Sequence, residues 1–172
     1  MSVVVAETSD SDVSWAFRAA MRRVASTVAV ITTQHAGQPY GMTATAVTSL
    51  TASPASILVC VNNTASIRCP IVEEGRFCVN FLASRDSELC TVFSGAIAGP
   101  DRFRHGDWKE GMMGLPVLAS ADAALFCEVE RSDRYHSHTI FIGRVVEVET
   151  ASSMPDPLMY CAGRIGHFEG AR

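Results

Sequence analysis

The chain has 172 residues and a mass of 18.5 kDa, which suits one domain and is too short for two. Its 48% hydrophobic and 19% charged residues exclude a disordered chain. A net charge of −4 argues against nucleic-acid binding and against a membrane-surface role, because no cationic excess is available to neutralise phosphates. No apolar run approaches the ~18 residues of a spanning helix, and no secretory leader is apparent, so we expect a cytoplasmic protein.

The N-terminal region predicts a loose segment and then a helix. Residues 1–13 are mostly small or polar and lack periodicity, so we expect a flexible lead-in to a single domain over residues 14–172. Ser14 is a suitable N-terminal cap for the helix. Three apolar residues follow at helical spacing and form one stripe: Phe17, Met21 and Val24.

Strand patterns dominate the rest of the chain. β-Branched and alternating apolar runs, separated by turn residues, predict strands at residues 26–33, 41–49, 57–61, 77–82, 124–131, 138–149 and 157–161. Ser66 and Ser84 each begin a short predicted helix. Residues 94–114 are expected to form a long ordered loop, because Phe103 and Trp108 give it apolar side chains to bury.

These elements describe a mainly β protein, an antiparallel barrel with short peripheral helices. No long helix separates neighbouring strands, as a parallel sheet would require. The glycine-rich fingerprints of a Rossmann unit and of a P-loop are both missing, so any nucleotide cofactor binds by other means. The six cysteines include no closely spaced pair and mostly lie in apolar runs, which predicts buried, reduced and inert thiols.

The segment 43–56 is the first candidate for chemistry, with seven hydroxyl residues in fourteen, separated mostly by alanine. Small side chains let a planar ligand approach the backbone, and clustered hydroxyl and N–H groups can hold a phosphate. The predicted helix at Ser66 would add a second group of N–H donors, and Arg68 and Arg102 would add charge. The same pattern also fits an ordinary threonine-rich strand and edge loop.

Several motifs follow one another along the chain: Phe17-Arg18-x-Ala20-Met21-Arg22-Arg23-Val24-Ala25, Gly41-Met42-Thr43-Ala44-Thr45, Thr48-Ser49, Ser66, Arg76-Phe77-x-Val79-Asn80-x-Leu82-Ala83, Arg102-Phe103, Gly114-Leu115-Pro116-Val117-Leu118 and His138-Thr139-Ile140-x-Ile142-Gly143-Arg144-Val145. Together they resemble the flavin reductases that partner two-component flavin monooxygenases. The resemblance runs from about residue 14 to residue 165 and so covers nearly the whole chain.

The resemblance implies a split β-barrel, usually a homodimer, that binds FMN or FAD and reduces it with NADH or NADPH. Reduced flavin would then leave for a partner monooxygenase or another acceptor. Carried over by position, His138 is the histidine on the nicotinamide side. The implied flavin contacts are Thr43, Ala44, Thr45, Thr48, Ser49, Ser66, Arg102 and Phe103.

Two positions depart from the family pattern. Thr45 stands where asparagine is common, and the family's usual Gly-Asp-His-Thr reads His136-Ser137-His138-Thr139. The two histidines fall on one face of a strand, as a two-histidine metal site would require, but only Asp133 offers a third ligand nearby. We therefore expect no metal, and a solvated histidine pair without function remains an alternative.

Hydride transfer to flavin needs no side-chain nucleophile, which agrees with the lack of any recognisable hydrolase motif. Main-chain N–H groups of residues 43–49 are expected to stabilise the negative charge that reduction places on the flavin. Two other functions fit the same motifs. One is a flavoprotein that keeps its FMN and reduces a bulky acceptor such as a cob(II) corrinoid, and the other is a non-catalytic flavin-binding module.

Overall fold

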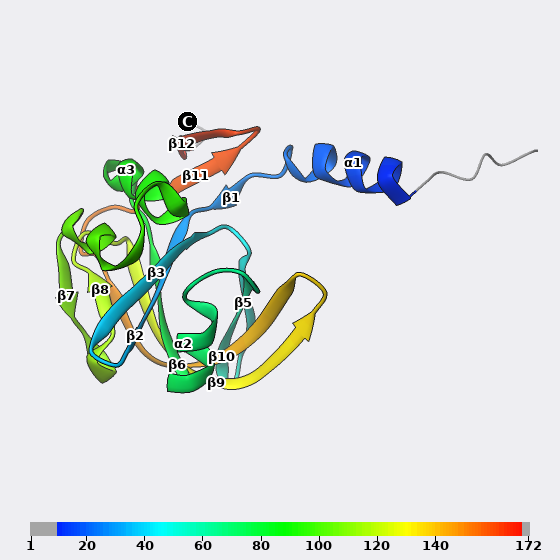
Figure 1. Cartoon of the computed structure of the whole chain (residues 1–172). Helices are drawn as coiled ribbons and strands as arrows, with labels where there is room; N and C mark the ends of the chain where they lie inside the picture. Colours follow the sequence, from blue (N-terminus) through cyan, green and yellow to red (C-terminus); the bar gives the residue numbers. More distant parts are fainter. Residues whose placement is uncertain (1–9, 170–172) are drawn as a thin grey trace, which may run out of the picture.

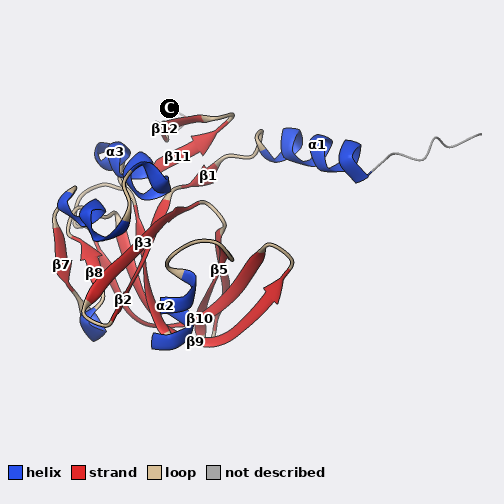
Figure 2. Cartoon of the chain, in the orientation of Figure 1, coloured by secondary structure: helices blue, strands red, loops and turns tan. Residues whose placement is uncertain are grey.

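The computed structural model describes residues 10–169 and is dominated by strands (Figures 1 and 2). The helices are α1 (Asp10–Met21), α2 (Arg68–Glu74) and α3 (Ser87–Thr91), with short helical turns η1 (Ser84–Asp86), η2 (Val92–Ala96), η3 (Gly99–Arg104) and η4 (Met112–Gly114). The strands are β1 (Ser26–Thr27), β2 (Ala29–His35), β3 (Gln38–Ala44), β4 (Val47–Ala52), β5 (Ala55–Asn62), β6 (Arg76–Phe81), β7 (Trp108–Glu110), β8 (Pro116–Leu118), β9 (Ala123–Tyr135), β10 (His138–Thr150), β11 (Leu158–Cys161) and β12 (Arg164–His167).

Seven strands form one antiparallel sheet in the order β3-β2-β6-β9-β10-β5-β4. Its two edge strands, β3 and β4, follow each other in the chain and are joined only by Thr45 and Ala46. A link of that length spans three Cα steps of ~3.8 Å, so the two edges must lie close together. The sheet is therefore curled into the predicted barrel, with a seam at β3 and β4.

Large apolar side chains pack on both faces of the sheet. Phe77 and Phe141 are fully buried in the core cluster that they share, and Phe126 is fully buried in a second cluster, with Leu115 and Val117. β2 is buried on both faces along Ala29–Thr33, because helical turns from residues 84–104 cover the side that turns away from the barrel interior. The strand therefore reads as a continuous apolar and threonine run instead of an alternating one.

The predicted hairpins are confirmed, with one adjustment to the first of them. β2 and β3 pair across the Ala36-Gly37 turn, and β9 and β10 pair across His136-Ser137. Ser26 and Thr27 do not extend β2 but form β1, which pairs with β11 in a small separate sheet. The strand expected at residues 41–49 is likewise two strands, because the chain passes from one edge of the sheet to the other at Thr45.

Other boundaries differ from the sequence prediction. α1 begins at Asp10, four residues early, so Ser14 lies inside the helix; Asp10 and Asp12 in the first turn favour this start. Residues 1–9 of the predicted lead-in lie outside the described residues. The helix expected after Ser84 is broken into three short pieces, and β12 was not predicted, because its sequence, Arg164–His167, has no apolar alternation.

All six cysteines are free thiols, but they are not uniformly buried. Burial raises the pKa of Cys127 to about 12 and raises that of Cys78 as well, so both stay neutral at physiological pH. Cys69 is exposed on α2, so the prediction of buried thiols is wrong there. Within the described residues, no helix is both long enough and apolar enough to traverse a bilayer.

Candidate functional site

A hollow of about 310 Å³ lies along the outer edge of β3. Three chain segments build it: the second half of β3, the loop before α2, and the turn η2 together with the residue Arg102 of η3. The lining residues are Met42, Thr43, Ala65, Ser66, Phe93, Ser94, Gly95 and Arg102. The structure thus brings together three of the predicted flavin contacts, Thr43, Ser66 and Arg102, from positions far apart in the sequence.

The backbone of β3 supplies polar groups to this edge. Arg102 Nη1 donates a hydrogen bond to the carbonyl oxygen of Gly41, so that carbonyl points away from β2. In an antiparallel strand the N–H and C=O of one residue point the same way, and residues two apart share that direction. The main-chain groups of Gly41 and Thr43 therefore face the outer edge, where those of Thr43 and the N–H of Gly41 can bond to a planar ligand, whereas the Gly41 carbonyl is bonded to Arg102.

Arg102 is a buried cation without a counter-ion. The residue is 8% exposed, and its Nη2 donates to the carbonyl oxygen of Ile97 at 2.7 Å. Nε has no hydrogen-bond partner, and no carboxylate in the described part of the chain pairs with the guanidinium. Burial lowers its pKa for want of solvation. A phosphate bound here would supply the missing charge and acceptor, so these residues fit a flavin phosphate.

A smaller hollow of about 180 Å³ adjoins the first, and both are lined by Ser66 and Arg102. Its other walls come from the start of β3 and from Gly99-Pro100 of η3. Arg102 therefore stands between two concave spaces along the same strand edge. Together they give an elongated ligand more room than either hollow alone.

An aromatic cluster supports the wall of the site. Phe93 packs edge-on against Phe103 with ring centroids 5.1 Å apart, and Trp108 packs against both. Gly41 makes room for this cluster, since a Cβ there would lie 2.6 Å from Phe93 Cε1. Phe103 does not line either hollow. Its ring packs behind them, against Phe93, against Trp108 and close to Gly41.

The remaining predicted contacts lie elsewhere. Ala44 is buried in the barrel core. Thr48 and Ser49 are exposed on β4 and line neither hollow. Thr45 lines a larger hollow of about 640 Å³ between α1 and the β3–β4 link. That hollow is bounded by apolar side chains of a projecting helix without buried residues, so we assign the ligand site to the smaller one, where the polar groups converge.

His138 is exposed at the start of β10, and its Nδ1 is hydrogen-bonded to Ser137 Oγ at 2.9 Å. The turn before it is tied to the loop after β5: Asn63 Nδ2 donates to the carbonyl oxygen of His136, and Asn63 N donates to that of Ser137. This loop carries Ala65 and Ser66 of the first hollow. The hairpin turn and the hollow thus share one connecting segment.

Comparisons with known proteins agree on one family. The model of the flavin reductase like domain matches residues 21–169. The chain belongs to this family.

Two relatives and one solved structure illustrate the match. An FMN reductase (NADH) RutF of Pseudomonas syringae pv. syringae is 40% identical over 152 residues, covering 88% of this chain and 85% of the relative. The reductase component of an FADH(2)-dependent resorcinol hydroxylase from Rhizobium sp. is 39% identical over 84% of this chain and 81% of its own. The Streptomyces globisporus NADH:FAD oxidoreductase SgcE6, solved with NAD and FAD fragments, superposes with a TM-score of 0.85 at 28% identity, covering 95% and 98% of the two chains.

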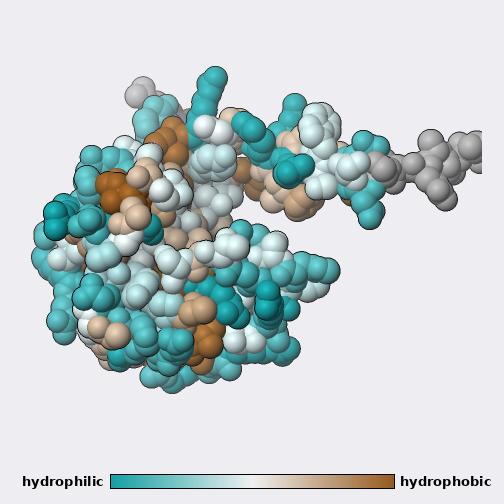
Figure 3. Space-filling view, in the orientation of Figure 1, coloured by the Kyte–Doolittle hydropathy of each residue, from teal (hydrophilic) through white to brown (hydrophobic). Residues whose placement is uncertain are grey.

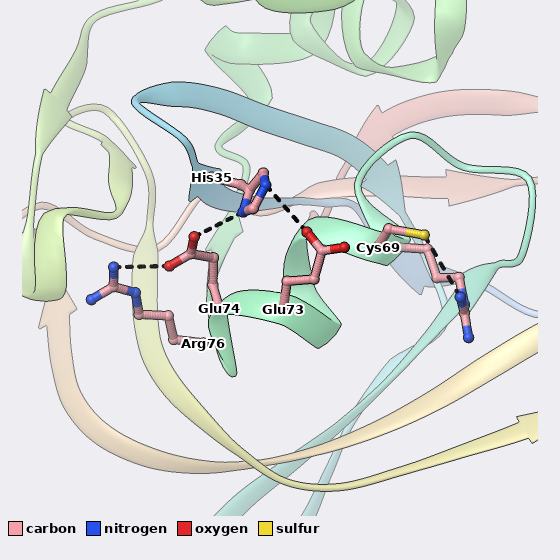
Figure 4. A network of polar contacts seen from close by, with 6 residues as sticks. His35, Cys69, Glu73, Glu74 and Arg76 are labelled. Carbon is pink, nitrogen blue, oxygen red and sulfur yellow. Dashed lines mark hydrogen bonds and ion pairs between the residues drawn. The ribbon is translucent and has the colours of Figure 1, made fainter.

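This flavin reductase-like chain also contains a polar network that sequence reasoning missed (Figure 4). His35, at the end of β2, bonds Glu74 through Nδ1 at 2.9 Å and Glu73 through Nε2 at 3.2 Å. Glu74 also pairs with Arg76 at 3.2 Å. The network fastens α2 to the barrel and so holds the loop that carries Ser66. The adjacent acids Glu73-Glu74 are the only sign of this network in the sequence, because His35 lies 39 residues before Glu74.

The histidine departures from the family pattern also have defined places. His136 occupies the left-handed region at φ 47°, and its ring packs edge-on against Tyr135. Among residues 10–169, no three His, Cys, Asp or Glu side chains gather as a metal site would require. Asp133 instead pairs with Arg131 at 2.5 Å.

Proposed function

We propose that the protein is an NAD(P)H:flavin oxidoreductase that reduces FMN, or FAD, with a reduced nicotinamide. The observation that carries this proposal is Arg102, a buried residue that lines the hollow beside the edge of β3, leaves its Nε without a hydrogen-bond partner and has no carboxylate partner among residues 10–169. The names of the relatives support the reaction, since one is an NADH-dependent FMN reductase. We place the activity in one domain, predicted at residues 14–172.

A bound flavin supplies the redox chemistry, because its ring accepts the hydride of the nicotinamide. The chain's task is to bind and orient. Arg102 and Ser66 would hold the phosphate of the flavin, and the main-chain N–H of Thr43 would stabilise the negative charge that reduction adds to it. Phe93 and Ala65 would give the site apolar surface. No side-chain nucleophile takes part.

We further propose that the reduced flavin is delivered to a flavin-dependent monooxygenase or another separate acceptor. The support is the resorcinol hydroxylase relative, which is the reductase component of a larger system. Flavin exchange also fits a site with one buried charge, because each 1.4 kcal/mol of extra affinity would make release tenfold rarer. A cytoplasmic location is proposed with it, supported by six free thiols.

The projecting helix α1 supports a homodimer. None of its residues is buried, and Trp15 is 70% exposed and Phe17 63%. Figure 3 shows apolar side chains gathered on the lower side of this helix. We expect a second copy to cover them. Sedimentation of the wild type should give a dimer, and the double variant Trp15→Ser with Phe17→Ser should be a monomer. Val72→Ser is the control: Val72 is an exposed apolar residue on α2, and this variant should stay dimeric. A monomeric wild type would contradict the proposal.

The nicotinamide role of His138 predicts a specific kinetic change. Anaerobic NADH should bleach the flavin absorption of the wild type. His138→Ala should raise the KM for NADH about tenfold, the effect of losing one oriented hydrogen bond, and should leave the FMN Kd within about twofold. His167→Ala, an exposed histidine on β12, is the control. Absence of bleaching in the wild type rejects the reductase, whereas a raised FMN Kd in His138→Ala would place this side chain at the flavin.

A further inference from the structure

The turn that carries His138 is held in an unfavourable backbone conformation. His136, its first residue, has φ 47°, which glycine adopts freely and residues with a side chain adopt at a cost. Something in the surrounding structure must therefore stabilise this turn. Tyr135 packs edge-on against the His136 ring, but both side chains are exposed and provide little constraint.

The stabilising contacts come from one residue, Asn63, in the loop between β5 and α2. Asn63 Nδ2 donates to the carbonyl oxygen of His136 at 2.8 Å, and its main-chain N donates to that of Ser137 at 2.9 Å. Asn63 Oδ1 accepts a hydrogen bond from Thr139 Oγ1 at 2.7 Å. Asn63 thus bonds to the residues on both sides of His138.

This arrangement extends inward to rigid structure. Thr139 is 2% exposed, and its hydroxyl also accepts a hydrogen bond from Arg68 Nε at 3.0 Å, at the start of α2. A buried hydroxyl with both partners in place has a fixed orientation, so it fixes Oδ1 of Asn63 in turn. Because Ala65 and Ser66, which line the hollow of about 310 Å³, lie in the same loop, Asn63 links that hollow to the turn before His138.

We infer that Asn63 is a positioning residue for hydride transfer, which clamps the strained His136 turn so that His138 meets the nicotinamide beside the flavin site. The inference rests on the proposed function of His138. It assigns no contact between Asn63 and either cofactor, so its effect should appear in the use of NADH and not in flavin binding.

Two variants and a rescue test the clamp. Asn63→Ala removes both side-chain bonds, whereas Asn63→Asp keeps the acceptor for Thr139 and loses only the donor to His136. Each should lower kcat/KM for NADH, by about tenfold for alanine and about threefold for aspartate, with the FMN Kd within about twofold. His136→Gly should restore Asn63→Ala to within about threefold of wild type, because glycine needs no clamp at positive φ. Thr64→Ala, whose side chain bonds only to Asn62, is the control.

Hydrogen exchange of the peptide spanning residues 134–140 tests the clamp directly, and the kinetics separate the clamp from the nicotinamide role of His138. Faster exchange in Asn63→Ala, unchanged exchange in Thr64→Ala and the rescue by His136→Gly support the clamp. If His138→Ala lowers kcat/KM for NADH but Asn63→Ala does not, the clamp is wrong and the role of His138 stands. If neither variant affects NADH use, the role of His138 is wrong and the clamp loses its function with it. Loss of flavin affinity in Asn63→Asp would also overturn the inference.

Discussion

Arg102→Met is expected to raise the FMN Kd by about tenfold to a hundredfold, the range that corresponds to one charge-assisted hydrogen bond of roughly 1.5–3 kcal/mol. Methionine keeps an unbranched apolar side chain but removes the guanidinium of Arg102, which lines the hollow and has no carboxylate partner among the described residues. The measurement is FMN titration followed by flavin fluorescence. Riboflavin, which has the same ring and no phosphate, should bind wild type and variant with affinities within about threefold of each other.

Riboflavin makes this experiment decisive, because Arg102 also has a structural role in bonding Gly41 and Ile97. If riboflavin affinity falls as far as FMN affinity, the side chain only shapes the wall and the phosphate assignment is lost. Arg104→Met is the matched control: Arg104 lies in the same turn η3, is exposed, and pairs with Asp101 at 3.2 Å. Its FMN Kd should stay within about twofold, as for most exposed ion pairs.

Much of the fold could be predicted because local patterns determine it. Strand alternation and the turn residues identified both long hairpins, and the lack of crossover helices excluded a parallel sheet. The barrel seam could not be derived this way. Residues 41–49 read as one continuous strand, and only the sheet order shows that β3 and β4 occupy opposite edges. That order depends on pairings between distant segments, which leave no local signal.

Thr43, Ser66 and Arg102 lie around one hollow, and their contact with flavin stays a prediction. Ser66 does not cap α2, because Ile67 precedes the helix, without a side-chain cap bond. Thr48 and Ser49 do not join them, because β4 takes them to the other edge of the sheet. A hydroxyl-rich composition could not separate the two strands.

The loop between β5 and α2 connects these observations. It lines the hollow through Ala65 and Ser66 and contacts the hairpin turn through Asn63. The helix that follows it, α2, is bonded to β2 through the ion pair of Glu74 with His35. If the flavin binds at the hollow and the nicotinamide at His138, as proposed, hydride transfer would need the reacting atoms to be held about 3–3.5 Å apart. A short loop bonded at both ends provides that rigidity without a large interface.

Gly41→Ala is expected to disturb both stability and flavin binding, because the added Cβ meets the aromatic wall. It would lie 2.6 Å from Phe93 Cε1 and 3.1 Å from Phe103 Cζ. Phe93 cannot move away easily, since it is buried and packed against Phe103 and Trp108. We expect a loss of about 1–3 kcal/mol in the free energy of unfolding, the usual cost of overpacking a core.

Flavin affinity should also fall. We expect the FMN Kd to rise by at least about fivefold, because relief of the clash shifts Phe93, or the Arg102 side chain that bonds Gly41, toward the hollow. Gly166→Ala is the matched control, because a Cβ at Gly166 meets nothing within 4 Å and its φ is not positive. Urea unfolding and FMN titration of both variants give the comparison. If Gly41→Ala loses stability but keeps its FMN affinity, the wall yields away from the hollow, and the flavin does not lie against Phe93. If it matches Gly166→Ala in both measurements, the close packing of β3 against the aromatic cluster is not what shapes this edge of the barrel.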